Sequence, residues 1–257
     1  KSRSRGLGDV YKRQAISLSN KKGKIIKDFF DSLNFVVLKS LEILMIIAPM
    51  GIFCLIAKTF STQGLEVILE LGKYFFTVVF CLLLHVLIIY GSLVLYFAKI
   101  SPFTFFIRLK DALIFSFSTS SSSATIPVTL KCVTKNLNVR SKIASFTVPL
   151  GSTINMDGTA LYQAIAAVFI AQTLGMDLSL GAQSTIVLTA VLASIGTAAV
   201  PGAGIITLVI ILEAIGVPSV GLALILGVDR ILDMLRTVTN VTGDASVAVA
   251  IASSEKN

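Results

Sequence analysis

The chain has 257 residues, of which 54% are hydrophobic and 14% are charged, and its formal net charge is +8. Its mean hydropathy is +0.87. Soluble domains carry about a quarter charged residues, so this composition excludes an ordinary soluble domain and indicates a membrane protein. The basic residues lie in short loops between apolar runs, which follows the topology rule for membrane proteins and argues against nucleic-acid binding.

The first 14 residues, KSRSRGLGDVYKRQ, share no pattern with the rest of the chain, and we predict that they are a non-native leader. We expect the remainder to be a portion of a longer protein. Six apolar stretches come after this segment, the first from about residue 29 to 60 and the second from about residue 74 to 98. Both are long enough for a spanning helix, and Pro49 is expected to kink the first.

The next four stretches are interrupted or polar. The third, residues 103–133, breaks at TSSSSATIP, and the fourth contains NMDGT at 155–159. The fifth, residues 178–212, has no charged residue and breaks at GTAAVPGAG. The sixth, from about 220 to 252, carries several charges and the motif NVTGD at 240–244.

The charges of the loops predict the topology. Basic loops precede the first stretch, follow the second, and separate the third from the fourth, so all three are predicted to be cytoplasmic. The third stretch must then enter the membrane and return. The fourth crosses, the fifth enters and returns from outside at its Pro201–Gly202 break, and the sixth brings the C-terminus to the cytoplasm. The alternative is a low-complexity serine loop and a glycine-proline surface turn, but the apolar arms are too short to span separately.

This order is a repeat, in which an interrupted hairpin and a span with NMDGT are followed by an interrupted hairpin and a span with NVTGD. Inverted repeats with interrupted helices surround the binding site of many secondary transporters. Non-helical backbone inside a membrane must be buried in protein or line a cavity. We therefore predict an all-α membrane protein with two oppositely oriented re-entrant helical hairpins and two unwound spans.

One face of the sixth stretch is polar. At 100° per residue, a sector of about 80° contains most of its charged and amide side chains. These are Asp229, Asp233, Arg236, Asn240 and Asp244, with Thr237 at the edge. A charge at the centre of a span costs about 2.5–3.5 kcal/mol, so these side chains must face inward and pair or bind ligands. The alternative is a purely structural pair of Asp233 and Arg236 at i,i+3 spacing.

The spans also carry a surplus of negative charge, with Asp157, Asp229, Asp233 and Asp244 against Arg230 and Arg236. A buried surplus implies bound cations, and aspartate and asparagine oxygens with carbonyls freed at helix breaks suit Na⁺. Backbone N–H groups and serine hydroxyls at the hairpin tips would bind one carboxylate. Arg236 would bind a second carboxylate, and Asp233 an ammonium group. Two carboxylates and one ammonium describe aspartate or glutamate.

Four motifs, TSSSSATIPVTL, PLGSTINMDGTALYQ, SIGTAAVPGAG and DRILDMLRTVTNVTGD, closely resemble the dicarboxylate/amino acid:cation symporters, the glutamate transporter homologues, from about residue 25 to the end. The resemblance implies a homotrimer in the cell membrane, either a bacterial inner membrane or a plasma membrane. It implies sodium-coupled symport of glutamate or aspartate by an elevator motion, and no enzymatic activity. A scaffold-type helix is expected in 15–65 and a transport domain in 66–257. The expected parts of the transport domain are a helix at 66–100, hairpin one at 103–134, a broken helix at 141–174, hairpin two at 178–216 and a polar-striped helix at 219–252.

The resemblance also implies site residues. The substrate contacts would be Ser121, Ser122, Thr159, Val200, Gly204, Asp233, Arg236, Thr237 and Asn240. The co-transported Na⁺ ions would lie at three positions, formed by Gly151, Asn155, Asn240 and Asp244, by Thr153, Met156, Ser194, Ile195 and Thr197, and by Asn155 with Asp157.

Some positions depart from the family pattern. Ser120 stands where some homologues have arginine, and Arg230 is expected to supply that charge instead. Ala124 and Ala199 replace glycines common at the hairpin tips, which would stiffen them. The expected early helices, which would form much of the trimer scaffold and complete the third sodium position, are missing from the sequence.

Several alternatives stay open on the sequence alone. Carboxylates also serve proton coupling, and a neutral amino acid carrier or a dicarboxylate carrier is a nearer rival than an enzyme. An intramembrane aspartyl protease would use Asp157 and Asp244 as a dyad. For His85, the only histidine, packing is favoured over a proton relay. The tyrosines Tyr74, Tyr90 and Tyr96 are candidate anchors at the membrane interface.

Overall fold

The computed structural model describes residues 66–255 without a gap, and before them residues 24–26, 28, 29, 32, 33, 35, 36, 39, 40, 43, 50, 53, 54 and 57. The chain divides into two compact units, Lys1–Ala57 and Lys58–Asn257. The described positions of the first unit are all helical. The predicted leader and the predicted kink at Pro49 lie outside the described residues.

Within residues 66–255 the structure consists of helices and their connections, so an all-helical architecture is confirmed there. In chain order the elements are α3 (Glu66–Leu84), η1 (His85–Tyr90), α4 (Gly91–Ala98), α5 (Pro102–Thr119), α6 (Ser122–Lys131), η2 (Cys132–Asn136), α7 (Ser141–Ile154), α8 (Asp157–Thr173), α9 (Leu180–Ile195), α10 (Ala203–Ala214), η3 (Ser219–Gly221) and α11 (Leu222–Ser254). The segments η1 and η2 are π-helical, and η3 is a 3₁₀ turn.

Two helical stretches of the described chain, Leu69–Ala98 and Ser141–Thr173, are long and apolar enough to cross a membrane. The helices α9 and α10 are apolar but shorter. Large apolar side chains such as Phe76, Phe97 and Leu192 are more than half exposed. Extended apolar surface of this kind marks a contact with lipid or protein, as expected for a membrane protein.

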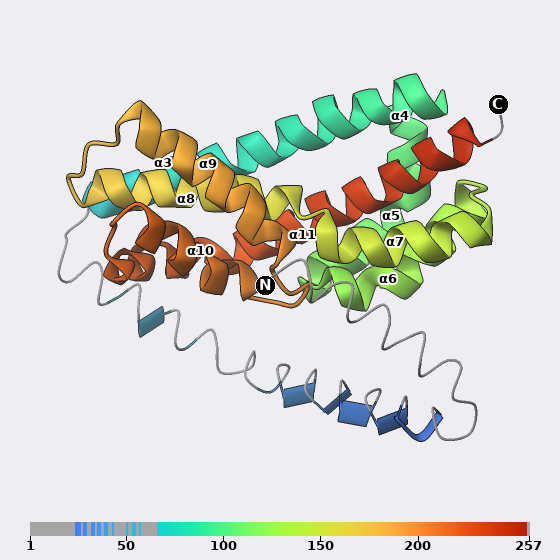
Figure 1. The fold of residues 1–257 in the computed structure, drawn as a ribbon, viewed down its shortest axis with the longest axis horizontal. Coiled ribbons are helices and arrows are strands. Elements are labelled where there is room, and N and C mark those ends of the chain that lie inside the picture. The colour runs from blue at the N-terminus through green and yellow to red at the C-terminus, as the bar shows by residue number, and fades with distance from the viewer. Residues whose placement is uncertain are drawn as a thin grey trace. The chain divides into compact units, whose positions relative to one another are not determined.

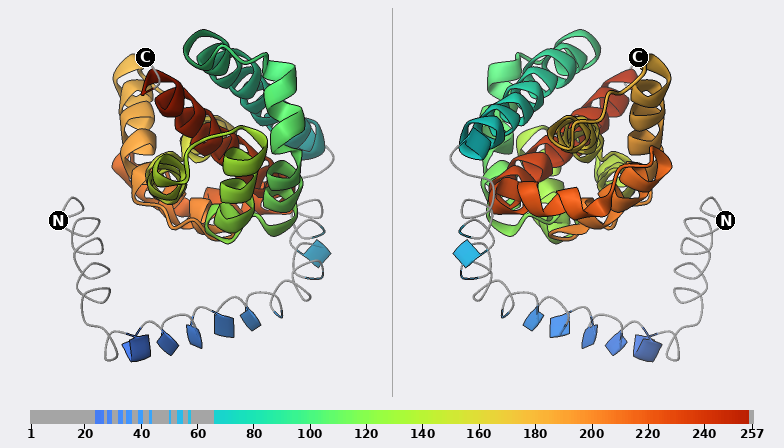
Figure 2. Two further views of the ribbon diagram at one scale, coloured as in Figure 1. Left: turned by 90° about the vertical axis from the view of Figure 1, so that its right-hand side faces the viewer. Right: turned by 90° about the vertical axis from the view of Figure 1, so that its left-hand side faces the viewer.

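The long helix α11 runs through the middle of the second unit and packs against α3, α4, α5, α7 and α8 (Figure 1). Two apolar cores lie along it. The first joins α3, α8, α9 and α10 to the first half of α11, through residues that include Val78, Tyr162, Ile170, Ile186, Leu208 and Ile225. The second joins α4, α5, η2 and α7 to its second half, through residues that include Val94, Phe105, Leu109, Ala144, Val148 and Ala245. The two views of Figure 2 show the other helices of the second unit grouped around α11.

The middle of the polar stripe of α11 lies between these cores. Leu232 belongs to the first core and Val241 to the second. The residues between them include Asp233, Arg236 and Asn240, and all three are buried. The polar side chains are therefore enclosed by protein with an apolar core on either side.

Three interruptions between helices lie close to the polar stripe of α11. Between α7 and α8 the backbone leaves the helical region, with φ/ψ of −92°/79° at Asn155 and −114°/51° at Met156. Between α5 and α6, Ser120 is left-handed with a φ of 50°. Between α9 and α10, Gly202 is left-handed with a φ of 75°, a conformation that glycine adopts without strain.

The predicted unwinding at NVTGD is wrong for this structure, because α11 continues through residues 240–244. The motif residue Gly243 serves close approach instead of a break. A Cβ added at Gly243 would lie 2.7 Å from Cζ of Tyr90 and closer still to the side-chain nitrogen of Asn155. The hydroxyl of Thr242 also donates to the carbonyl oxygen of Val238 at 2.7 Å, within the helix.

Candidate functional site

The connections of the two helix pairs α5–α6 and α9–α10 meet. The hydroxyl of Ser121 donates to the carbonyl oxygen of Ala199 at 2.8 Å, and the backbone N–H of Ser123 donates to the same oxygen at 3.3 Å. The Ser121 oxygen also caps α6 by accepting from the N–H of Ala124 at 3.2 Å. The serines of this run therefore cap the start of α6 and link the α5–α6 connection to the α9–α10 connection by hydrogen bonds.

The guanidinium of Arg236 is fully enclosed, with 1% of the residue exposed. Its Nη2 lies 2.7 Å from Oδ1 of Asp233 and 3.6 Å from Oδ1 of Asp229. Its Cζ lies 3.9 Å above the ring centre of Tyr162, a cation–π contact. Among the described residues, Nε and Nη1 have no hydrogen-bond partner. A buried guanidinium with two unused donors can bind a carboxylate.

Asp233 connects this arginine to the α9–α10 connection. Its Oδ2 accepts a hydrogen bond from the backbone N–H of Gly202 at 2.9 Å and lies 4.0 Å from Nη1 of Arg230. The structural pair of Asp233 and Arg236 considered from the sequence is thus present. The pair leaves donors of Arg236 free, so a structural role does not use up its binding capacity.

The start of α10 packs directly against the same guanidinium. A Cβ added at Gly204 would lie 3.0 Å from Cζ of Arg236, inside normal contact distance. The Gly204 carbonyl accepts a hydrogen bond from Nε2 of Gln163 at 2.9 Å, and Nε2 also lies 2.5 Å from the hydroxyl of Thr207. Gln163 of α8 therefore holds the first turn of α10 beside Arg236.

A second polar group lies where the α7–α8 break meets α11. Nδ2 of Asn155 donates to Oδ1 of Asp244 at 3.1 Å and to the carbonyl oxygen of Asn240 at 3.4 Å. A Cβ added at Gly151 would lie 2.5 Å from Oδ1 of Asp244. The structure thus brings together all four residues of the first expected sodium position.

Asn240 and Asp157 extend this group to the start of α8. The Asn240 side chain accepts from the N–H of Gly158 at 2.9 Å and donates to the hydroxyl of Thr159 at 3.2 Å. Asp157 is the first residue of α8, where a negative charge is favoured by the helix dipole. Its Oδ2 accepts from the hydroxyl of Tyr90 at 2.8 Å and lies 3.4 Å from Nε2 of His85.

The remaining expected sodium position is not assembled by side-chain contacts in the described part of the chain. The hydroxyls of Thr153, Ser194 and Thr197 each donate to a carbonyl of the preceding turn. Met156 is buried, whereas Ile195 is 48% exposed. Of the expected substrate contacts, Ser122 and Thr237 are buried, and Val200 is 37% exposed.

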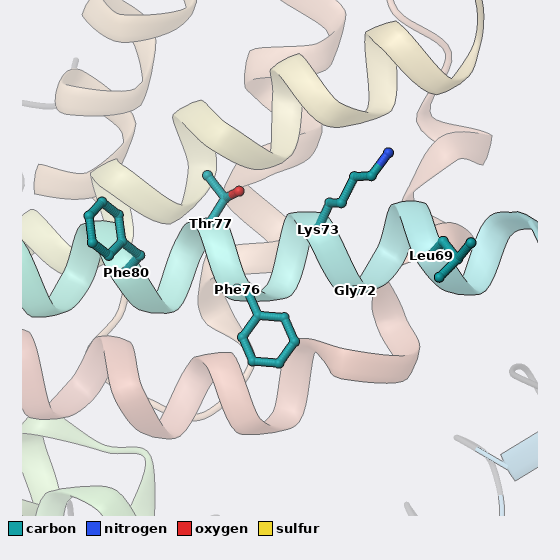
Figure 3. Close-up of a pocket in the computed structure, with 6 residues that line it drawn as sticks. All are labelled: Leu69, Gly72, Lys73, Phe76, Thr77 and Phe80. Atoms are coloured by element: carbon teal, nitrogen blue, oxygen red, sulfur yellow. The ribbon is translucent and has the colours of Figure 1, made fainter.

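Two surface hollows lie elsewhere, and neither is lined by an expected site residue. Among the described residues, one of about 600 Å³ is lined by side chains of α3, as Figure 3 shows: Leu69, Gly72, Lys73, Phe76, Thr77 and Phe80. The other, of about 580 Å³, lies between α3, α8 and α9.

Several contributors to the site were not expected from the sequence. Tyr74 and Tyr90 are buried rather than placed as interface anchors, and Tyr96 is 75% exposed. Tyr162 and Gln163 lie three and four residues after Thr159, the last residue of NMDGT, and nothing in their spacing predicted a contact with Arg236 or Gly204.

A family model for the sodium:dicarboxylate symporter family matches residues 14–254 of the chain. Excitatory amino acid transporter 3 of Mus musculus is 46% identical over 231 residues, which is 90% of this chain and 44% of that protein. Excitatory amino acid transporter 1 of Ambystoma tigrinum is 46% identical over 226 residues, 87% of this chain and 42% of that protein. Excitatory amino acid transporter 4 of Mus musculus is 44% identical over 232 residues, which is 90% of this chain and 41% of that protein. The chain spans less than half the length of these relatives.

Proposed function

Because this chain belongs to the sodium:dicarboxylate symporter family, we propose that the whole protein couples the transport of an acidic amino acid, aspartate or glutamate, to Na⁺. The relatives named as excitatory amino acid transporters support the amino acid class. Sodium is a co-transported ion in this proposal and not a resident cofactor. A family of transporters gives no support to the aspartyl protease alternative.

The observation that carries the proposal is the buried pair of Arg236 and Asp233 beside the two helix connections. The free donors of Arg236 suit the side-chain carboxylate of the substrate. Asp233, now held by the N–H of Gly202, suits the ammonium group. The connection residues Ser121 and Ser122, with the backbone N–H groups near them, suit the second carboxylate. Thr159, Val200, Gly204, Thr237 and Asn240 complete the proposed substrate site.

The first proposed sodium position surrounds the buried carboxylate of Asp244. Asp244 is 3% exposed and has no ion pair with a basic residue among the described residues. Its oxygens, with those of Asn155 and Asn240, offer the hard ligands that Na⁺ prefers. The second position uses Thr153, Met156, Ser194, Ile195 and Thr197, and the third uses Asn155 with Asp157.

The proposed architecture places α5–α6 and α9–α10 as re-entrant hairpins that enter from opposite faces, with the α7–α8 break as an unwound span. Residues 66–257 form the transport domain and 15–65 a scaffold helix, in a homotrimer that works by an elevator motion. The C-terminus is cytoplasmic, and the protein spans a bacterial inner membrane or a plasma membrane several times. The apolar exposed faces of α3, α4 and α9 agree with a bilayer around part of this surface.

Uptake of radiolabelled aspartate and glutamate by the whole protein in liposomes tests the proposal. We expect accumulation driven by an inward Na⁺ gradient, competition by the other acidic amino acid, and little competition by neutral amino acids or by dicarboxylates without an amine. Uptake that depends on a pH gradient and ignores Na⁺ would assign coupling to protons. Failure to take up any acidic amino acid under either gradient would refute the substrate class.

A further inference from the structure

The hydroxyl of Tyr90 lies among the proposed cation ligands, although it belongs to a different part of the chain. Tyr90 is the last residue of η1, a π-helical turn between α3 and α4. Single π-helical turns occur often at functional sites, because they turn a side chain away from its regular direction. Tyr90 is 3% exposed, and its hydroxyl donates to Oδ2 of Asp157 at 2.8 Å.

The backbone of α11 is shaped to admit this side chain. Gly243 has no Cβ, and an added one would lie 2.7 Å from Cζ of Tyr90 and closer still to its hydroxyl oxygen. The same Cβ would collide with Nδ2 of Asn155, which itself bonds Asp244 at 3.1 Å. The Tyr90 hydroxyl and the Asn155 amide therefore share the space that Gly243 leaves open.

The ring of Tyr90 is also held in place. His85 packs edge-on against it, with ring centres 4.8 Å apart and an interplanar angle of 90°. Nε2 of His85 lies 3.4 Å from the same Asp157 oxygen that accepts from Tyr90. Two side chains of one π-helical turn thus meet one carboxylate.

We propose that Tyr90 is a further residue of the Asn155–Asp157 sodium position, and this inference rests on the proposed function. A phenol that donates its hydrogen to a carboxylate keeps two lone pairs on the oxygen. Those lone pairs give a hard, neutral ligand next to Asp157, while the hydrogen bond fixes the carboxylate orientation. Tyr90 then acts on Na⁺ affinity and leaves the substrate contacts around Arg236 unchanged.

The variant Tyr90→Phe removes this oxygen and keeps the ring and its contact with His85. The control is Tyr96→Phe, at an exposed tyrosine of α4. Two measurements on the whole protein separate the roles: the rise of the melting temperature with Na⁺ in the absence of substrate, and the Na⁺ dependence of aspartate uptake. A ligand that binds only the folded state raises stability according to its concentration relative to its dissociation constant.

For Tyr90→Phe we expect a lower melting temperature without Na⁺, because the hydrogen bond to Asp157 is lost. We also expect about tenfold more Na⁺ for half-maximal stabilisation and an unchanged aspartate KM at saturating Na⁺. Tyr96→Phe should match the parent in all three. Gly243→Ala, whose Cβ would displace the hydroxyl, should also raise the Na⁺ requirement. If Tyr90→Phe needs no more Na⁺ than the parent, the inference is overturned. This holds even when the melting temperature without Na⁺ falls, since Tyr90 is then a packing residue. A parent protein with no response to Na⁺ overturns the proposed sodium coupling itself.

Discussion

Replacing Gly204 by alanine should weaken acidic substrates by displacing Arg236. The added Cβ would lie 3.0 Å from Cζ and 3.4 Å from Nη2 of Arg236, and closer to Nη1. Carbon atoms in contact prefer about 3.5–4.0 Å, so the guanidinium has to move by roughly half an ångström or more. Its position is fixed by Asp233 at 2.7 Å and by the ring of Tyr162. The shift therefore misaligns its donors.

The expected effect is the loss of one charge-assisted hydrogen bond to the substrate. Such a bond contributes about 1.5–3 kcal/mol, which corresponds to a loss of affinity of roughly tenfold to a hundredfold. Folding should survive, because Gly204 lies in the first turn of α10 without a positive φ, and the atom in the way is the end of a side chain.

The assay is an aspartate titration at saturating Na⁺, with the melting temperature measured in parallel. The control is Gly72→Ala in α3, where an added Cβ meets nothing within 4 Å. It adds the same methyl group to a helix without touching the site and should bind aspartate as the parent does. An unchanged aspartate affinity in a folded Gly204→Ala protein would refute the placement of Arg236 against α10 during binding.

Three further substitutions test other contacts. Arg236→Thr should weaken acidic substrates by about 2–5 kcal/mol and favour small neutral amino acids, measured by competition for uptake; an unchanged aspartate affinity would remove Arg236 from the site. Asp244→Asn should lower Na⁺ affinity and, through it, apparent aspartate affinity, with partial recovery at high Na⁺ in titrations at several Na⁺ concentrations; full affinity without Na⁺ would contradict it. Gly158→Ala should lower the melting temperature, because its Cβ would lie 2.8 Å from the carbonyl oxygen of Arg236 and 2.9 Å from Cβ of Thr239, whereas a parent-like value would contradict this packing of α8 on α11.

Most of what the sequence predicts about the fold follows from its composition and from the serine, glycine and proline residues that interrupt the apolar stretches. Left-handed or non-helical backbone at Ser120, Asn155 and Gly202 falls inside the serine, NMDGT and glycine-proline runs. The motif NVTGD gave a wrong prediction of unwinding, because a glycine in a helix can mark either a break or the close approach of another segment. Which of the two applies depends on the residues that pack against the glycine. At Gly243 the neighbours are Tyr90 and Asn155, which are 153 and 88 positions away along the chain, and no local pattern reports them.

The candidate site, too, could be predicted from the sequence only in part. The polar stripe of α11 follows from helical periodicity alone, so the sequence pattern is enough to place Asp233, Arg236 and Asn240 on one buried face. Tyr90 could not be placed, because a tyrosine in an apolar run suits both an interface anchor and a core position. The π-helical turn that directs it to Asp157 has no signal in the residues HVLIIY.

The arrangement of the two cores gives a physical reason for coupling between ion and substrate. Asp244 is almost fully enclosed and is held by the amide of Asn155 at 3.1 Å, which supplies a hydrogen bond but no charge. An enclosed carboxylate without a compensating cation is unfavourable by several kcal/mol, so this part of the fold gains stability when a cation is bound. An acidic amino acid brings a further net negative charge beside Arg236, whose own charge already faces Asp233 and Asp229. In the proposed function, each bound cation would therefore lower the cost of binding the substrate. Because binding free energies are linked, the substrate must raise the affinity for Na⁺ by the same factor.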